Sequence, residues 1–166
     1  MNNVTDLIKK HESLRLYCYD DANGARLNLG DKAKGKPTIG YGHTGPDILP
    51  GTIISEAEAD SILEHDIINA ESDCNRIFGR AWPAFGQVRR AAFTDMAFNV
   101  GRTGISEFQL MIRAALDGDW PEVARQALSS KWAGEVHSRA DDDAMLLETG
   151  EWLPEPPPKP GDAMAT

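Results

Sequence analysis

The sequence predicts an α+β fold, with a small antiparallel sheet lobe near the N-terminus and a mostly helical C-terminal lobe. Short alternating runs rich in aromatic and β-branched residues occur before residue 45, whereas from residue 55 onward apolar residues recur at three- and four-residue steps. With 166 residues, 41% of them hydrophobic, the chain is long enough to build a sizeable core. We therefore expect the two lobes to form a single domain over residues 1–153.

The N-terminal part is expected to contain a short helix followed by strands. Thr5 can cap a first helix, whose apolar pattern ends near Glu12. The alternating segment 14–19 and the segment 37–42 predict two strands, separated by a stretch rich in Gly, Asn and Lys. The first helix therefore ends close to the start of a small sheet.

Helices are expected to dominate the rest of the chain. The segment Ser55-Glu56-Ala57-Glu58 is a capping box and predicts the start of a long helix. Residues 85–100 are apolar on most sides of a helix, which indicates a central core helix, and residues 108–116 repeat the helical period. The tail at 154–166 is rich in proline, and we expect it to be flexible.

Composition excludes several classes of function. A formal net charge of -9 argues against nucleic-acid binding. No stretch approaches the roughly 20 apolar residues that span a bilayer, so we expect no stable membrane insertion, and the start of the chain lacks the pattern of a signal peptide or signal-anchor. Cys18 and Cys74 are far apart and have no His or Cys beside them at metal-ligand spacing. We therefore expect neither a disulfide framework nor a metal.

Two carboxylates could serve glycoside hydrolysis, which commonly uses one protonated and one ionised carboxyl group. Glu12 lies where the first helix ends, and Asp21 lies where the first strand enters a turn. They are nine positions apart, and a reversal of the chain could bring both to the rim of one cleft. This spacing alone is weakly specific, because acidic residues are common at helix ends and turns.

The surrounding motifs are more specific than the carboxylates. The segments are His11-Glu12-Ser13-Leu14-Arg15-Leu16, Tyr19-Asp20-Asp21, Thr38-Ile39-Gly40-Tyr41-Gly42-His43-Thr44, Met96-Ala97-Phe98-Asn99-Val100-Gly101, Gly118-Asp119-Trp120, Lys131-Trp132, Ser138-Arg139-Ala140 and Thr149-Gly150-Glu151-Trp152. In this order they resemble the phage T4-type lysozymes, the endolysin family also classed as glycoside hydrolase family 24. The resemblance covers residues 5 to 152, and although each motif is modest, the ordered set is specific.

The resemblance implies a lysozyme-like catalytic domain that hydrolyses the β-1,4 bond between N-acetylmuramic acid and N-acetylglucosamine in peptidoglycan. In this family Glu12 would be the general acid, while Asp21 and Thr38 would serve the attacking water with inversion of the anomeric carbon. No cofactor would be needed. The family's Tyr-any-Asp pattern after Tyr19 selects Asp21, although Asp20 could compete for the role.

Further site residues follow from the same resemblance. Phe98 and Thr44 would border the sugar, although Phe98 could also belong in part to the core. Arg139 would lie next to the catalytic glutamate, where its positive charge opposes a general acid, and its alternative role is that of a surface helix residue. His43 would pair with Asp66 in a structural role, which we favour over proton transfer.

Two departures from the family pattern stand out. Residues 22–37 separate the catalytic Asp and Thr, whereas family members commonly have only a few residues there. We expect an enlarged hairpin whose flanking strands remain paired, because surface loops tolerate length at low cost. The acidic run 141–143 replaces residues that are often basic in the family.

The resemblance also gives a biological setting and two alternatives. A monomeric enzyme of this kind would stay in the host cytoplasm until a separate membrane-permeabilising protein released it to the cell wall for phage host-cell lysis. One alternative is a lytic transglycosylase, in which the sugar's own 6-hydroxyl replaces water. The other is a catalytically silent wall-binding module. The combination of Glu12, Asp21 and Thr38 argues against both alternatives.

Overall fold

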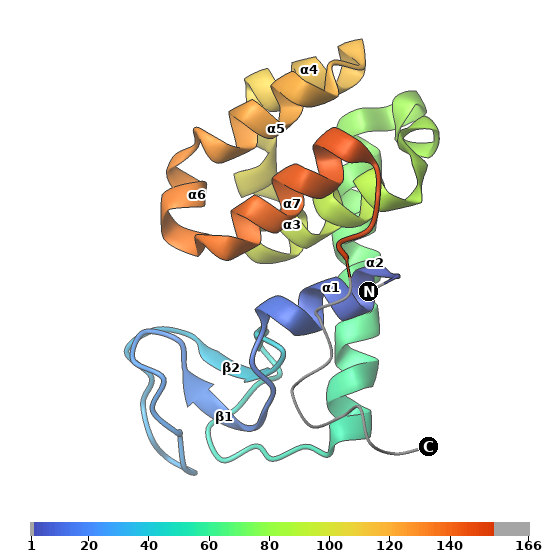
Figure 1. The fold of residues 1–166 in the computed structure, drawn as a ribbon. Coiled ribbons are helices and arrows are strands. Elements are labelled where there is room, and N and C mark those ends of the chain that lie inside the picture. Colours follow the sequence, from blue (N-terminus) through green and yellow to red (C-terminus); the bar gives the residue numbers. More distant parts are fainter. Residues whose placement is uncertain (1, 155–166) are drawn as a thin grey trace, which may run out of the picture.

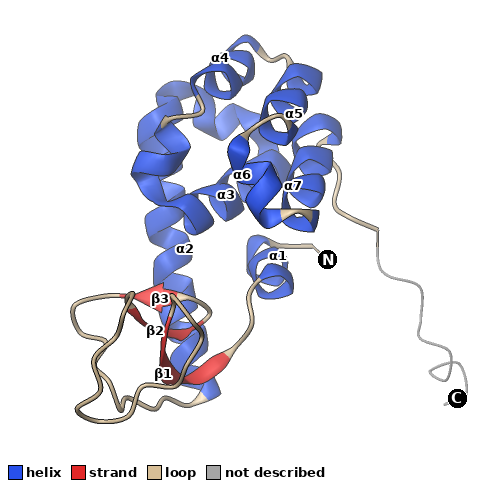
Figure 2. Cartoon of the chain, turned by 90° about the vertical axis from the view of Figure 1, so that its left-hand side faces the viewer, coloured by secondary structure: helices blue, strands red, loops and turns tan. Residues whose placement is uncertain are grey.

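The long helix α2 (Glu56–Phe78) connects a small lobe of strands and loops to a larger helical lobe. In the computed structural model, which describes residues 2–154, the strands lie at one end of this helix and helices α3 to α7 lie at the other (Figures 1 and 2). The predicted α+β fold is confirmed. The proline-rich segment that we expected to be flexible lies outside the described residues, apart from Pro154.

The small lobe contains a three-stranded antiparallel sheet in the order β1-β2-β3. Its strands are β1 (Arg15–Asp20), β2 (Pro37–Gly40) and β3 (His43–Thr44). Helix α1 (Val4–His11) leads into the sheet and packs against α2 and α3. Its N-cap is Asn3, whose side-chain oxygen accepts a hydrogen bond from the Asp6 N–H, so the prediction of Thr5 as the cap was wrong. Thr5 instead lies inside the first turn.

The insertion between β1 and β2 folds back on the sheet. The two strands stay paired up to Asp20 and Pro37, as we expected for an enlarged hairpin. The loop is fastened by the Leu27 N–H, which donates to the Cys18 carbonyl (2.9 Å), and by the Gly51 N–H, which donates to the Leu27 carbonyl (2.8 Å). A small buried cluster lies beneath it, formed by Cys18, Leu27, Ile39 and Ile48.

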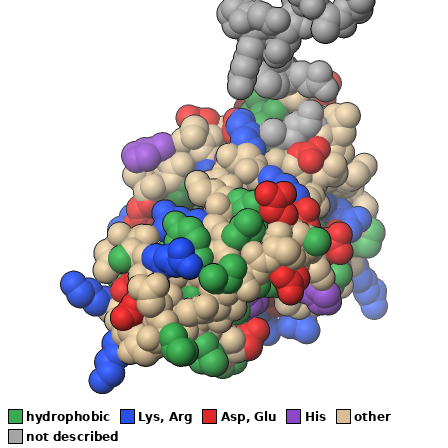
Figure 3. Space-filling view, turned by 90° about the horizontal axis from the view of Figure 1, so that it is seen from below, with side chains coloured by type: hydrophobic (Ala, Val, Ile, Leu, Met, Phe, Trp, Pro, Cys, Tyr) green, Lys and Arg blue, Asp and Glu red, His purple; other side chains and the backbone are tan. Residues whose placement is uncertain are grey.

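The outer surface of this lobe mixes apolar and basic side chains. Seen from below, hydrophobic and basic groups lie close to one another on this face (Figure 3). Leu29, Leu49 and Ile53 are the large aliphatic residues that the small lobe exposes. Residues 22–53 contain four basic and two acidic residues, a net charge of +2 in a chain whose total is -9. The small lobe's loops are therefore less negative than the rest of the chain.

Helix α2 begins as the sequence predicts. Ser55 Oγ accepts from the Glu58 N–H (3.2 Å), and the Glu58 carboxylate accepts from the Ser55 N–H (2.7 Å), so both halves of the capping box are present. Six further helical elements follow in the described part of the chain: η1 (Gly79–Phe85), α3 (Gly86–Ser106), α4 (Gln109–Asp117), α5 (Trp120–Leu128), α6 (Lys131–Val136) and α7 (Ser138–Thr149).

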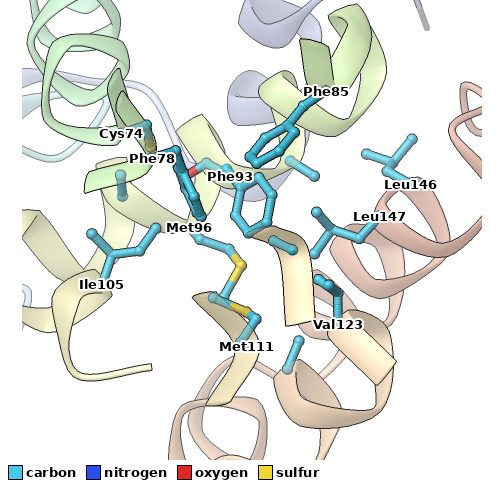
Figure 4. Close-up of a cluster of buried hydrophobic side chains, with 14 of the residues drawn as sticks. Cys74, Phe78, Phe85, Phe93, Met96, Ile105, Met111, Val123, Leu146 and Leu147 are labelled. Atoms are coloured by element: carbon cyan, nitrogen blue, oxygen red, sulfur yellow. Dashed lines mark hydrogen bonds between the residues drawn. The ribbon is translucent and has the colours of Figure 1, made fainter. Parts of the chain in front are cut away.

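Phe93 of α3 lies at the centre of the helical lobe's core (Figure 4). The centroid of its ring lies 4.6 Å from that of the Phe78 ring and 5.8 Å from that of the Phe85 ring, so α2, η1 and α3 meet around it. Leu146 and Leu147 bring α7 to the same core. Helix α3 is the central core helix that the periodicity predicts, and it holds one buried acid, Asp95.

No helix within residues 2–154 has both the length and the apolar character needed to cross a membrane.

Candidate active site

Glu12 lies at the junction between α1 and the sheet. It is the C-cap of α1, and its backbone N–H donates to the Ile8 carbonyl (2.9 Å) while its own φ and ψ are extended (-106° and 139°). The chain therefore leaves the helix at Glu12. The side chain is 22% exposed and opens into a surface pocket of about 350 Å³. The other residues that line this pocket are Lys10, His11, Asn99, Val136, Ser138 and Arg139.

Arg139, in the first turn of α7, connects Glu12 to the interior. Its Nη1 donates to Glu12 Oε1 (2.5 Å), while Nε and Nη2 donate to the two carboxylate oxygens of Asp95 (2.8 and 3.0 Å). A cation at a helix N-terminus is opposed by the helix dipole. Burial also disfavours the charge, but Asp95 and Glu12 more than offset it and raise the pKa of Arg139. The expected position of Arg139 beside Glu12 is what the structure shows.

One residue with a strained backbone, His137, sets the position of Arg139. His137 ends α6 and begins α7 with φ 48° and ψ -112°, and it is the one residue other than glycine with positive φ among those described. Such a conformation costs roughly 1–3 kcal/mol. It turns the chain from one helix into the next within one residue, which places Arg139 over Glu12.

The two neighbouring aspartates, Asp20 and Asp21, have different environments. Asp20, the last residue of β1, is 2% exposed and accepts hydrogen bonds from the backbone N–H groups of Lys34 (2.7 Å), Gly35 (2.9 Å) and Ala22 (3.1 Å). These bonds, led by that of Lys34, lower the pKa of Asp20. Asp20 therefore holds the insertion at residues 34 and 35, just before it returns to β2, whereas Asp21 is exposed.

Thr38 and Asp21 meet at the backbone of Lys36. The Asp21 carboxylate accepts from the Lys36 N–H (2.6 Å), and the Lys36 carbonyl accepts from both the Asp21 N–H (3.2 Å) and Thr38 Oγ1 (3.1 Å). Gly35 allows this closure, because a Cβ atom there would lie 2.0 Å from Asp21 Oδ1. The structure thus brings Asp21 and Thr38 together in spite of the long insertion.

Tyr19 lies on the same face of the sheet as Thr38. It pairs with Thr38 in the sheet, and because side chains alternate along a strand, Tyr19 and Thr38 share a face that Asp20 does not. Burial raises the pKa of the Tyr19 hydroxyl, the nearby Arg15 opposes this shift, and the negative charges of Glu12 and Asp21 add to it. Both carboxylates therefore lie within electrostatic range of one phenol.

The expected sugar-binding residues line a neighbouring pocket of about 220 Å³. Phe98 and Thr44 are both in its wall, together with His43 and Asp66, whose Nδ1 and Oδ2 atoms are 2.8 Å apart. Gly42 also lines this pocket, and a Cβ atom there would lie 3.6 Å from Glu12 Oε2. The pocket therefore adjoins Glu12. Phe98 also packs against the cores of both lobes.

Comparison with known proteins agrees with this arrangement. The family model described as "Phage lysozyme" matches residues 9–140. The chain belongs to the phage lysozyme family. That match includes every residue discussed so far as a candidate for the site.

Three relatives illustrate the range of proteins that this chain resembles. It is 28% identical to the pre-baseplate central spike protein Gp5 of Enterobacteria phage T4, over 89% of this chain and 28% of that protein. It is 30% identical to a SAR-endolysin of Bacteriophage PS119, over 69% of this chain and 66% of the relative. It is 21% identical to a probable T4-type lysozyme 1 of Dictyostelium discoideum, over 90% and 96%. The chain thus spans less than two thirds of the first two relatives.

Sequence reasoning missed a buried polar cluster behind Glu12. Asp95 is completely buried, and the enclosed His11 lies between two carboxylates, with Nδ1 3.1 Å from Asp95 and Nε2 2.9 Å from Asp142. Lys10 also contacts Asp142. A neutral imidazole has only one N–H, so two carboxylate partners require the protonated form. An acid on the apolar face of α3 was the available signal for this cluster.

Within residues 2–154 no group of three or more His, Cys, Asp or Glu side chains is arranged to hold a metal ion. Cys18 and Cys74 are both buried and free. Burial raises the pKa of the Cys74 thiol, and its Sγ donates to the Phe93 carbonyl. Both thiols are therefore packed inside the protein.

Asp20→Ala and Asp21→Ala are expected to separate stability from activity. Loss of Asp20 leaves three backbone N–H groups without their acceptor, so the thermal midpoint should fall by several degrees. Loss of the exposed Asp21 should leave the midpoint nearly unchanged but reduce lysis at least ~100-fold. Calorimetry and a turbidity assay on permeabilised bacteria measure the two effects. Full lysis by Asp21→Ala would show that the motif register is wrong.

Stability is expected to fall as the pH rises through the His11 transition. Burial opposes the charged imidazole, yet the bonds to Asp95 and Asp142 raise its pKa in the folded protein. The protonated form therefore stabilises the fold fully below about pH 6.5, the unfolded value, and this contribution is lost as pH rises through the folded value. Chemical unfolding over a pH series measures the slope.

The matched control for this prediction is the exposed His65 of α2, whose Nδ1 contacts the Ser61 carbonyl. His11→Gln should remove the pH-dependent component, and His65→Gln should retain it. An identical slope in the parent and in His11→Gln would contradict the assignment of a protonated His11.

Proposed function

We propose that this protein is a muramidase that hydrolyses the β-1,4 bond between N-acetylmuramic acid and N-acetylglucosamine in bacterial peptidoglycan. Glu12 is the general acid, and Asp21 and Thr38 serve the attacking water. The observation that carries the proposal is that the backbone of Lys36 holds Asp21 and Thr38 together, while Glu12 lies at the end of α1 and opens into a surface pocket. Membership of the phage lysozyme family supports the same reaction class.

The proposed reaction needs two protein groups on opposite sides of the sugar. Glu12 protonates the departing glycosidic oxygen, while Asp21 accepts a proton from the water that attacks the anomeric carbon. Thr38 is 2% exposed and its hydroxyl donates to the Lys36 carbonyl, which leaves its lone pairs to accept from that water. The attack inverts the configuration, and no covalent intermediate or cofactor is required.

Arg139 brings a positive charge next to Glu12. The Arg139 guanidinium donates to Glu12 Oε1 at 2.5 Å and so orients the carboxyl group. Asp95 takes two of the guanidinium's N–H groups and supplies a compensating negative charge on the side away from the substrate. Arg139 can therefore orient Glu12 while much of its charge is neutralised from behind.

The substrate and setting follow from the same proposal. Phe98 and Thr44 would contact the sugars in the pocket beside Glu12. The exposed side chains of Arg26, Lys32 and Lys34 make the small lobe more compatible with the anionic wall than the total charge implies. We propose that the protein acts as a monomeric endolysin in phage host-cell lysis, and that a separate membrane-permeabilising protein releases it from the host cytoplasm.

Glu12→Gln is expected to abolish lysis and leave the fold intact. The amide keeps the shape of the carboxyl group and can still contact Arg139, but it cannot donate the catalytic proton. The expected loss is at least ~100-fold in the turbidity assay at equal concentrations of folded protein. Glu64→Gln, an exposed acid on α2, is the matched control and should retain the parent's activity. Lysis by Glu12→Gln within a few-fold of the parent would remove Glu12 from its role.

The products are expected to have reducing ends with the α-anomer formed first. A water interposed between sugar and Asp21 corresponds to a carboxyl separation of ~6.5 to 9.5 Å, against ~5 to 5.5 Å for direct attack. NMR of freshly cleaved glycan measures the anomer, and mass spectrometry identifies the ends. If the β-anomer forms first, the reaction retains the configuration, and a covalent mechanism takes the place of inversion. If the products carry 1,6-anhydro ends, the enzyme is a lytic transglycosylase.

A further inference from the structure

An unpartnered acid lies behind Arg139. Asp143 of α7 is completely buried, and neither of its carboxyl oxygens has a hydrogen-bond partner among the described residues. It follows Arg139 by four residues, so the two side chains lie on the same face of the helix. The proposed reaction does not use Asp143.

The charged groups around Asp143 come from three helices. The charged groups that act on it are Asp95 of α3 and Arg139 and Asp142 of α7. From α1, His11 reaches Asp95 and Asp142, and Lys10 reaches Asp142. Helix α5, which also packs against α7, buries only the apolar residues Val123, Ala124 and Ala127.

The hydrogen bonds identify which of the two facing carboxyls is ionised. Asp95 accepts from Arg139 Nε and Nη2 and from His11 Nδ1, and these bonds lower its pKa although burial acts in the opposite direction. Asp143 receives no such donor, and burial together with the charge of Asp95 raises its pKa well above the ordinary value. Two ionised carboxylates in contact inside a protein are strongly disfavoured. The proton therefore belongs to Asp143.

We propose that Asp143 is a positioning residue of the candidate active site, whose protonated carboxyl donates a hydrogen bond to Asp95 and so fixes the carboxylate that holds Arg139 against Glu12. Its effect on turnover rests on the proposed function of Glu12. Its effect on Arg139 does not.

The proposal gives Asp95 donors from two helices. His11 approaches from α1, whereas Arg139 and Asp143 approach from α7, so the Asp95 carboxylate cannot rotate without breaking a bond. If Asp143 ionised, it would become a second carboxylate competing for the Arg139 guanidinium. Arg139 would then be drawn away from Glu12, which would lose its orientation.

Three variants separate this role from simple packing. Asp143→Asn keeps the shape and supplies an N–H donor to Asp95 at every pH. Asp143→Leu fills the space but cannot donate. Asp141→Asn, which changes an exposed acid on the same helix, is the matched control. The stability of each variant is measured by thermal unfolding, so that activity is compared only between folded proteins.

The first readout needs no substrate. The NMR resonance of the Arg139 Nε–H group reports the position of the guanidinium. It is expected to move in Asp143→Leu and to stay close to the parent's position in Asp143→Asn and Asp141→Asn. On a soluble peptidoglycan fragment, kcat of Asp143→Leu is expected to fall at least about 10-fold with KM nearly unchanged, because a misplaced group slows the chemical step. Asp143→Asn should restore kcat.

The second readout is the titration of the carboxyl carbon of Asp143, followed by NMR between about pH 3 and 9. Asp143 is expected to stay protonated well above about pH 3.9, where an ordinary aspartate ionises. When it does ionise, the Arg139 resonance should move in the parent and remain fixed in Asp143→Asn. If Asp143→Leu does not fold, this comparison decides the question.

Two results would overturn the proposal: ionisation of Asp143 at or below its ordinary value, or an Arg139 resonance that is the same in the parent and in Asp143→Leu. Absence of muramidase activity from the folded parent would instead refute the proposed function. The Arg139 and titration measurements would still decide the role of Asp143 in that case.

Discussion

The arrangement of the candidate site depends on one buried guanidinium. Arg139 joins the end of α1, through Glu12, to the central helix α3, through Asp95, and it does so from the first turn of α7. Removal of one partner from a buried ion pair typically costs about 3–5 kcal/mol, because the other charge is left uncompensated. The helices of the larger lobe and the start of the small lobe are therefore coupled at the residue that orients Glu12.

The same constraint explains the buried acids nearby. A buried guanidinium needs compensating negative charge, and Arg139 finds it in Glu12 on one side and Asp95 on the other. Asp95 in turn needs donors, and His11 provides one from α1. Polar groups enclosed in this way are stable only when each has a partner. The cluster is therefore one connected unit, although its residues lie in three helices.

The insertion illustrates how the small lobe accommodates a long loop without losing the site. Successive backbone N–H groups at residues 34–36 donate to Asp20 and Asp21, and the loop's apolar side chain Leu27 is buried against the sheet. Asp20 accepts the hydrogen bonds that hold the loop, whereas Asp21 remains exposed. These hydrogen bonds therefore fix the loop where it returns to β2, next to Thr38.

The sequence by itself determined the lobes, the capping box at Ser55 and the central helix, because periodicity and capping are local. Its ordered motifs also proposed Glu12, Asp21 and Thr38 as the candidate site. It did not determine the cap at Asn3, where several polar residues compete within one turn. Only the tertiary structure decided that Asp20 is enclosed and that His11, Asp95, Asp142 and Asp143 gather behind Arg139. Residues up to 132 positions apart meet there, and whether an acid is solvated or buried depends on packing between helices, which no local pattern records.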